Sequence, residues 1–133
     1  MQNKTVFDTN IWVSYFIKGK FNELIDFIES KNVTFYRCVE LLIELQEVLM
    51  RRKFRKYLTL PIENYINFFV SLTQTIIINK KFNACRDAKD NYLFDLAAQS
   101  KAKFLVSGDR DILSVSIPLP FMVMNLTDFK KAL

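Results

Sequence analysis

The chain has 133 residues, half of them hydrophobic and 14% aromatic, which is the size and composition of one folded domain. It contains no histidine, and this excludes histidine general bases, histidine zinc ligands and Ser–His or Cys–His nucleophiles. Its formal net charge of +5 is compatible with a nucleic-acid partner, although charge alone does not identify one.

Short apolar segments alternate with amphipathic ones along the chain. The apolar segments predict strands at residues 4–7, 33–36, 75–79, 103–106 and 121–125. Helical spacing and capping residues predict helices at residues 10–17, 21–30, 39–50, from Pro61 to about residue 75, from near Asp90, and at 128–133 with Thr127 as the cap. Because the strands are continuously apolar, we expect a three-layer α/β/α sandwich with a short, mainly parallel sheet.

Composition and cysteine spacing also bear on the number of domains and on the location of the protein. The chain contains no internal repeat, low-complexity segment or linker, so residues 1–133 are expected to form one domain. Cys38 and Cys85 lie too far apart for a zinc motif and are expected to be reduced, buried thiols. The start of the sequence, MQNKTVFD, has no apolar signal segment, and no apolar run approaches the ~18 residues of a membrane span. We therefore expect a cytoplasmic protein without a membrane partner.

Acidic residues follow two of the predicted strands. Asp8 comes directly after residues 4–7, and Asp109 follows the strand and turn KFLVSG. Ligands of parallel α/β sheets bind beyond the carboxyl ends of the strands, so these two carboxylates are expected at one edge.

Two predicted helices add acids to that edge. On a helical wheel at ~100° per residue, Glu44 falls at the boundary of the buried face of residues 39–50, whereas Glu40 and Glu47 point to solvent. Asp90 projects to the inner side of its helix, and Asp95 points away from it. Asp87 precedes that helix in a loop, and its direction cannot be read from the sequence.

Each acid also has a simpler interpretation. Asp8, Asp90, Asp109 and Asp111 could cap the turn or helix that follows them, and Glu44 could pair with a nearby Lys or Arg. The coincidence of Asp8, Glu44, Asp90 and Asp109 at one edge is harder to explain in this way, because clustered carboxylates repel one another unless a positive charge compensates. Hard oxygen ligands without His or paired Cys select Mg²⁺ or Mn²⁺, and such a site binds phosphates and activates water.

Four stretches carry a family resemblance: VFDTNIWVS, ELLIELQEVLMRRKF, CRDAKDNYLFDLA and KFLVSGDRDIL. In order and spacing they resemble the motifs of the PIN-domain ribonucleases, and within these the VapC-like toxins of toxin–antitoxin pairs. The resemblance covers nearly the whole chain and retains all the acids of the pattern. One departure is Ala88, where the subgroup often has Pro, which concerns the loop more than the chemistry.

The resemblance implies a metal-dependent endoribonuclease that is the toxin of a type II toxin–antitoxin pair. It implies that Asp8, Glu44, Asp90 and Asp109 hold one or two Mg²⁺ ions (or Mn²⁺), with Asp111 as a possible further ligand. It also implies that Asn10, Ser107 and Asp87 surround and orient these ligands. An activated water would attack phosphorus in line and leave a 5′-phosphate and a 3′-hydroxyl. A protein antitoxin and a homodimer or higher oligomer are the partners expected from the family.

Some residues keep two interpretations. The basic run Arg51, Arg52, Lys53, Arg55 and Lys56 could contact RNA phosphates, or it could be a solvated helix end. The aromatic residues Trp12 and Phe16 favour a core or dimer position over base stacking.

Two other functions would also use part of this pattern. An aspartate-based phosphatase would use Asp8 as its nucleophile, but the expected second aspartate is replaced by Asn10. A non-catalytic RNA-binding module would not require all the acids to be retained.

Overall fold

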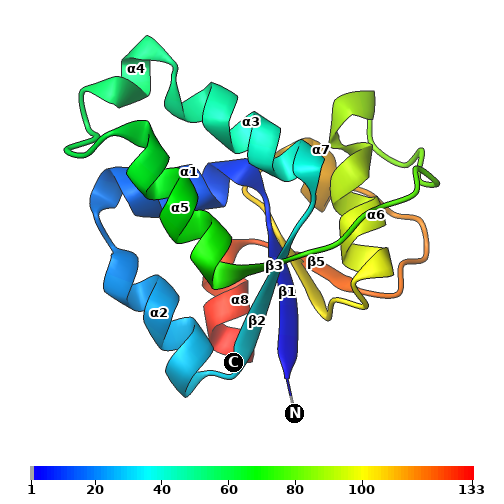
Figure 1. Cartoon of the computed structure of the whole chain (residues 1–133). Coiled ribbons are helices and arrows are strands. Elements are labelled where there is room, and N and C mark those ends of the chain that lie inside the picture. Colours follow the sequence, from blue (N-terminus) through cyan, green and yellow to red (C-terminus); the bar gives the residue numbers. More distant parts are fainter. Residues whose placement is uncertain (1) are drawn as a thin grey trace.

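A single parallel sheet organises the chain in this computed structural model, which describes residues 2–133. The strand order is β3-β2-β1-β4-β5 (Figure 1). The strands are β1 (Asn3–Phe7), β2 (Val33–Arg37), β3 (Thr73–Thr75), β4 (Phe104–Val106) and β5 (Met122–Met124), and every neighbouring pair is parallel. All the strands therefore end at the same edge, as a site at that edge requires.

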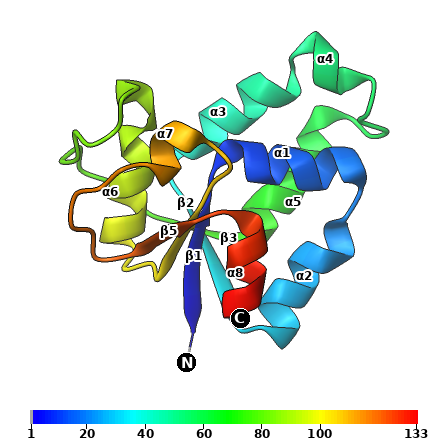
Figure 2. The same ribbon diagram turned by 180° about the vertical axis from the view of Figure 1, so that it is seen from behind.

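Helices connect successive strands and cover both faces of the sheet. They are α1 (Thr9–Lys18), α2 (Phe21–Ser30), α3 (Val39–Leu49), α4 (Arg52–Arg55), α5 (Ile62–Leu72), α6 (Asn91–Gln99), α7 (Arg110–Leu113) and α8 (Leu126–Ala132), with a 3₁₀ turn η1 (Ala88–Asp90) before α6. α1, α2, α5 and α8 lie on one side and α6 lies on the other (Figures 1 and 2). The predicted three-layer α/β/α sandwich is confirmed.

An aromatic cluster fills the space between the sheet and the α1–α2–α8 layer. The Phe7 ring lies 5.4 Å from Trp12, 4.7 Å from Phe35 and 5.4 Å from Phe129, measured between ring centroids. Trp12 and Phe16 are fully buried, so the prediction that they are core residues is confirmed. Edge-to-face contacts of this kind add to the stabilisation that comes from the buried area itself.

The third strand was predicted too late in the sequence. β3 spans Thr73–Thr75, not residues 75–79, and its last ladder bond runs from the amide of Ile76 to the carbonyl of Arg37, 2.8 Å away. β2 ends at Arg37, so residues beyond Ile76 have no strand to pair with. Ile77 is 94% exposed, although its apolar neighbourhood suggested a buried strand.

Two helix ends also differ from the prediction. α5 ends at Leu72, where β3 begins, and does not reach residue 75. The last helix starts earlier than predicted, because the side chain of Asn125, not Thr127, caps it by accepting a hydrogen bond from the amide of Asp128 at 2.9 Å.

The connector of residues 76–87 is held by a polar stripe on α6. The Asn91 side chain accepts hydrogen bonds from the amides of Ala84 and Cys85. The Asp95 carboxylate accepts hydrogen bonds from the amides of Lys81 and Phe82. The Gln99 side chain accepts a hydrogen bond from the Asn79 amide and donates one to the Asn79 carbonyl. These three side chains recur every four residues and therefore share one helix face. Asp95 points away from the inner face of α6, as the helical wheel predicted, but it is only 1% exposed because this connector covers the face opposite the sheet.

Other expectations concern the thiols and the membrane. Cys38 and Cys85 are free and buried, as predicted. None of the helices in residues 2–133 combines the length and apolarity needed to cross a bilayer.

We predict that Asp95→Ala lowers the free energy of unfolding by about 1–3 kcal/mol, because it leaves two backbone donors of the connector without their acceptor. Asp95→Asn keeps an acceptor oxygen and should cost less. Urea denaturation measures the loss, and hydrogen exchange should localise it to residues 76–87. Asp26→Ala, at an exposed position of α2, is the control and should change stability by less than ~0.5 kcal/mol. Equal losses in Asp95→Ala and Asp26→Ala would contradict the role of the stripe.

Candidate active site

Asp8 and Ser107 meet where the strand order reverses. β1 pairs with β4 through Phe7 and Val106, and the amide of Asp8 continues this ladder with a 2.9 Å bond to the Val106 carbonyl. The next residue of each strand therefore lies at the same point of the edge. There the Ser107 hydroxyl donates a 2.8 Å hydrogen bond to Oδ2 of Asp8. Open α/β sheets bind their ligands at such a reversal.

The Asp8 carboxylate is buried and does not cap a helix. It is 5% exposed and makes no side-chain capping bond to α1. Burial raises its pKa to about 6, and the charges of Glu44 and Asp109 act in the same direction, although the Ser107 hydrogen bond opposes them. The capping interpretation of Asp8 is therefore wrong. Its position costs stability, which suggests a functional reason for the carboxylate.

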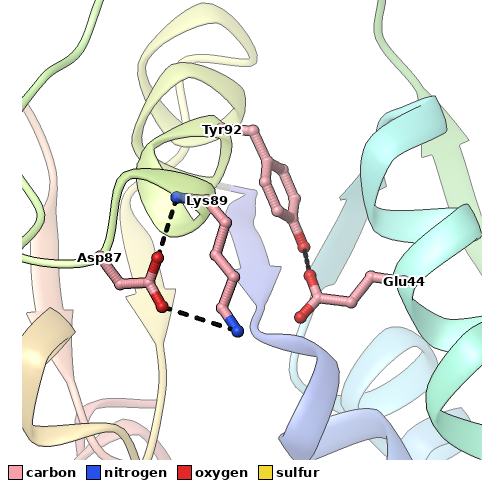
Figure 3. Close-up of polar contacts among 4 residues, drawn as sticks. All are labelled: Glu44, Asp87, Lys89 and Tyr92. Atoms are coloured by element: carbon pink, nitrogen blue, oxygen red, sulfur yellow. Dashed lines mark hydrogen bonds and ion pairs between the residues drawn. The ribbon is translucent and has the colours of Figure 1, made fainter.

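Glu44 approaches this edge from α3 and is oriented by Tyr92 from α6. The Tyr92 hydroxyl donates a hydrogen bond to Oε2 of Glu44 (Figure 3) and also lies 3.5 Å from the Thr9 hydroxyl. Glu44 is half-buried, as the helical wheel predicted, and it forms no ion pair with a Lys or Arg of residues 2–133. Sequence reasoning missed Tyr92, whose only signal was its place two residues after Asp90, because a tyrosine on an inner helix face ordinarily reads as core.

The other two glutamates of α3, Glu40 and Glu47, differ in how well their exposure matches the helical-wheel prediction. Glu47 is exposed, as predicted. Glu40 is half-buried and lines a surface pocket of about 230 Å³ together with Lys80, Lys89 and Tyr92, so it is less exposed than the wheel indicated. The connector and η1 form the far wall of this pocket, and no periodicity within α3 could reveal them.

Asp90 ends η1 and begins α6 without using its side chain as a cap. It is 8% exposed and makes no side-chain capping bond. Burial is the main cause that raises its pKa to about 6, and the negative charges of Asp8, Asp87, Asp109 and Glu44 raise it further. Carboxylates from β1, α3, η1 and the β4–α7 turn therefore lie close enough to influence one another.

Asp87 has the capping role that the sequence suggested for Asp90. Its side chain accepts a 3.2 Å hydrogen bond from the Lys89 amide and lies 3.6 Å from the Lys89 ammonium group (Figure 3). Both side chains are well exposed, so this pair contributes little to stability.

Asp109 both caps α7 and touches the Asp8–Ser107 pair. Its Oδ1 accepts a 2.8 Å bond from the Asp111 amide, and its own amide donates to the Ser107 hydroxyl at 3.0 Å. The capping interpretation is correct for one oxygen and leaves Oδ2 for another partner. Asp111 is half-buried beside it.

Cys85 is a further neighbour of the acids that sequence reasoning did not place. Burial raises the pKa of its thiol to about 11, and the charges of Asp90, Asp109, Asp111 and Asp87 contribute in that order. The thiol is therefore protonated at neutral pH and acts as an apolar wall rather than a thiolate ligand.

The donor set fits a hard divalent cation in its chemistry. Every ionised group is a carboxylate, and a cation would relieve the repulsion that helps to raise the pKa of Asp8 and Asp90. Within residues 2–133, however, no three acidic or thiol side chains are gathered tightly enough to form a ready-made metal cluster. Glu44 is turned to Tyr92 and Asp109 to the Asp111 amide, so side-chain rotation would have to accompany binding.

The remaining predicted residues lie around this edge in different ways. Asn10 is exposed and makes no hydrogen bond to an acid within the described chain. All five basic residues of the run are exposed: Arg51, Arg52, Lys53, Arg55 and Lys56. None of them forms an ion pair with an acid of residues 2–133; Lys53 and Lys56 instead lie over the rings of Phe54 and Tyr57. Their roles stay predictions.

Both the sequence and the fold are similar to those of known proteins. The sequence model of the family described as PIN domain matches residues 4–111. An uncharacterized protein of Methanocaldococcus jannaschii is 31% identical over 126 residues, which cover 92% of this chain and 81% of the relative. The fold is similar to a chain in the crystal structure of VapBC2 from Rickettsia felis bound to a DNA fragment from their promoter. That match has a TM-score of 0.57 and 16% identity, and it covers 92% of this chain and 98% of the other.

We predict that Asp8→Asn stabilises the metal-free protein at pH 7 but not at pH 4. The pKa of Asp8 lies above its unfolded value of 3.8, so the folded state binds more protons than the unfolded state between about pH 4 and 6. Stability from this group is therefore present below pH 4 and lost as the pH rises through about 6. Removing the charge should gain about 1–3 kcal/mol at pH 7.

Urea denaturation in EDTA at pH 4, 5.5 and 7 measures this effect. Asp26→Asn, in the exposed face of α2, is the matched control and should show no such trend. A pH-independent difference between Asp8→Asn and the wild type would mean that the carboxylate is not strained by its surroundings.

Proposed function

Because this chain belongs to the PIN domain family, we propose that it is a metal-dependent endoribonuclease and the toxin of a type II toxin–antitoxin pair. The observation that supports the proposal is the burial of Asp8, at the reversal point of the sheet, and of Asp90, whose pKa values are raised to about 6 partly by the charges of Glu44 and Asp109. Buried carboxylates that destabilise the fold are typical of functional sites.

The acids would hold one or two Mg²⁺ or Mn²⁺ ions, with Asp111 as a further ligand. When bound, such an ion supplies a water of lowered pKa and neutralises charge on the attacked phosphate. A pKa of about 6 leaves Asp8 and Asp90 mostly ionised at neutral pH and protonated in mild acid, so binding should weaken steeply below pH 6.

Neutral side chains would set the orientation of these ligands. Ser107 donates to Oδ2 of Asp8, which leaves Oδ1 for a cation, and Tyr92 holds one oxygen of Glu44 in the same manner. Asn10 and Asp87 are proposed to act around them, on the strength of the family resemblance.

The RNA strand would reach the acids past α4. The basic run forms α4 and its flanks, directly after the helix that carries Glu44 (Figure 1). Its cations have no acidic partner in the described residues and are therefore available to phosphates. This favours RNA contact over a merely solvated helix end.

The partners are proposed from the relative and from one surface. The Rickettsia felis structure is described as a VapBC2 complex with promoter DNA, which supports a protein antitoxin for this chain and a cytoplasmic location. Val39 and Ile43 of α3 and Met50, which follows its last residue, are 61%, 48% and 63% exposed and share one face, which supports a homodimer or higher oligomer.

We predict that the purified protein cleaves RNA with Mg²⁺ or Mn²⁺ and not in EDTA, and that Asp8→Asn and Asp90→Asn each lower the rate at least ~100-fold. A gel assay on a labelled RNA measures the rate, and end analysis should find 5′-phosphates. Asp26→Asn, exposed on α2, should keep wild-type activity. Tight RNA binding in EDTA without cleavage under any metal would instead favour a binding module. An acyl-phosphate on Asp8 would favour a phosphatase.

We predict that Tyr92→Phe weakens Mn²⁺ affinity by about 10–100-fold, because Glu44 loses the donor that fixes its carboxylate. Calorimetric titration measures the affinity, and saturating Mn²⁺ should restore most of the cleavage rate. Tyr57→Phe, at an exposed tyrosine, is the control. Unchanged metal affinity in Tyr92→Phe would show that the Tyr92–Glu44 bond is structural only.

A further inference from the structure

A second polar cavity lies at the other end of α1 from Asp8. It has a volume of about 100 Å³ and is formed where the end of α1, the start of α2 and α8 come together. These three helices cover the face of the sheet opposite α6 (Figure 2). The residues that matter here are Tyr15, Lys18, Lys20, Glu23 and Lys130. Tyr15 lies seven residues after Asp8, about 10 Å along a helix, so the cavity is separate from the acidic edge.

The charges around this cavity are unbalanced. Glu23 is paired with Lys130, whose ammonium group lies 2.5 Å from its carboxylate. Lys18 and Lys20 form no ion pair with any acid of residues 2–133. Three ammonium groups against one carboxylate leave an excess of two positive charges around a small space.

The Tyr15 hydroxyl is a buried donor that lies near the Glu23 carboxylate but forms no hydrogen bond of normal geometry with it. The side chain is 3% exposed, and its oxygen makes no hydrogen bond within the part of the chain that the structure describes. Burial holds the pKa of this phenol well above its usual range, and the charge and hydrogen-bonding proximity of Glu23 act in the same direction, so the phenol stays neutral and keeps its proton. Buried polar atoms of this kind are rare because an unsatisfied one destabilises the fold.

The backbone adds a third feature. α2 has ten residues, and no side chain caps its N-terminus at Lys20. Amide groups at the start of a helix, together with the helix dipole, favour an anion. Gly19, in the left-handed conformation at φ 66°, ends α1 and turns the chain so that Lys18 and Lys20 flank this start.

We propose that this cavity binds a phosphate-type oxyanion, either inorganic phosphate or the phosphate of a nucleotide. Lys18 and Lys20 supply charge, and Tyr15 supplies a neutral donor at the buried end. Lys130 remains shared with Glu23. The dianionic form of phosphate matches the local excess of two positive charges, and the volume admits one tetrahedral anion but not a base and sugar. A nucleotide would therefore insert only its phosphate. The proposal does not depend on nuclease activity.

Thermal unfolding with inorganic phosphate tests the proposal. At pH 8 in EDTA, replacing chloride by phosphate at constant ionic strength should raise the Tm of the wild type by a few degrees and then saturate. The double variant Lys18→Ala/Lys20→Ala should lose this dependence. Lys131→Ala, on α8 but outside the cavity, also removes a lysine charge and should keep the dependence. No saturable rise in the wild type, or an equal rise in the double variant, overturns the proposal.

A tyrosine variant separates binding from general charge effects. Tyr15→Phe removes an unsatisfied donor, so its Tm without phosphate should equal or exceed that of the wild type. Its phosphate affinity should fall about tenfold, as expected for losing one hydrogen bond to a charged group. Wild-type phosphate affinity in Tyr15→Phe would overturn the assigned contact.

Ligand comparison identifies the source of the anion. Uridine monophosphate that binds more tightly than inorganic phosphate assigns a nucleotide phosphate, and the reverse order assigns the free anion; either result supports the proposal. A Tm rise with uridine equal to that with uridine monophosphate would contradict it, because uridine carries no phosphate.

Discussion

The parallel pairing of β1 with β4 is the constraint on which the site depends. Phe7 and Val106 are partners in the ladder, so the chain leaves both strands at the same level, and Asp8 and Ser107 emerge side by side. The aromatic cluster around Phe7 holds β1 in the middle of the sheet, where it has a neighbour on each side. A carboxylate at this point is buried by the layers above and below it. The core and the acidic edge are therefore two consequences of one strand arrangement.

Helix α6 carries the second half of the arrangement. Its apolar face packs on the sheet, while Asn91, Asp95 and Gln99 accept backbone donors from the connector on the opposite side. That connector leads into Asp87 and η1, so the polar stripe also determines where Asp90 starts the helix. Tyr92, the residue after Asn91, then spans the gap to Glu44 on α3. A single nine-residue helix thus supports both the fold and the candidate site.

Charge is distributed unevenly along α1. At its start, Asp8 lies among carboxylates whose mutual repulsion and burial raise its pKa, and this destabilises the metal-free fold at neutral pH. At its end, Lys18 and Lys20 flank a cavity with a positive excess and an unsatisfied phenol. Both ends of the helix destabilise the ligand-free fold, and packing of the aromatic core must offset this destabilisation. Each effect would be relieved by a ligand of opposite charge, a cation at one end and an anion at the other.

The sequence by itself determined the alternation of strands and helices, the acids that follow β1 and β4, and the boundary position of Glu44, because these depend on local periodicity and on residues next to one another in the chain. It could not determine the end of β3, which depends on where β2 stops, or the burial of Asp95, which depends on a connector folding over α6. Tyr92 and Tyr15 were equally out of reach, since their partners, or the lack of one, come from other helices. Only the tertiary structure decided these points, because a side chain's partner is set by which segments meet in space and not by its own neighbours in the sequence.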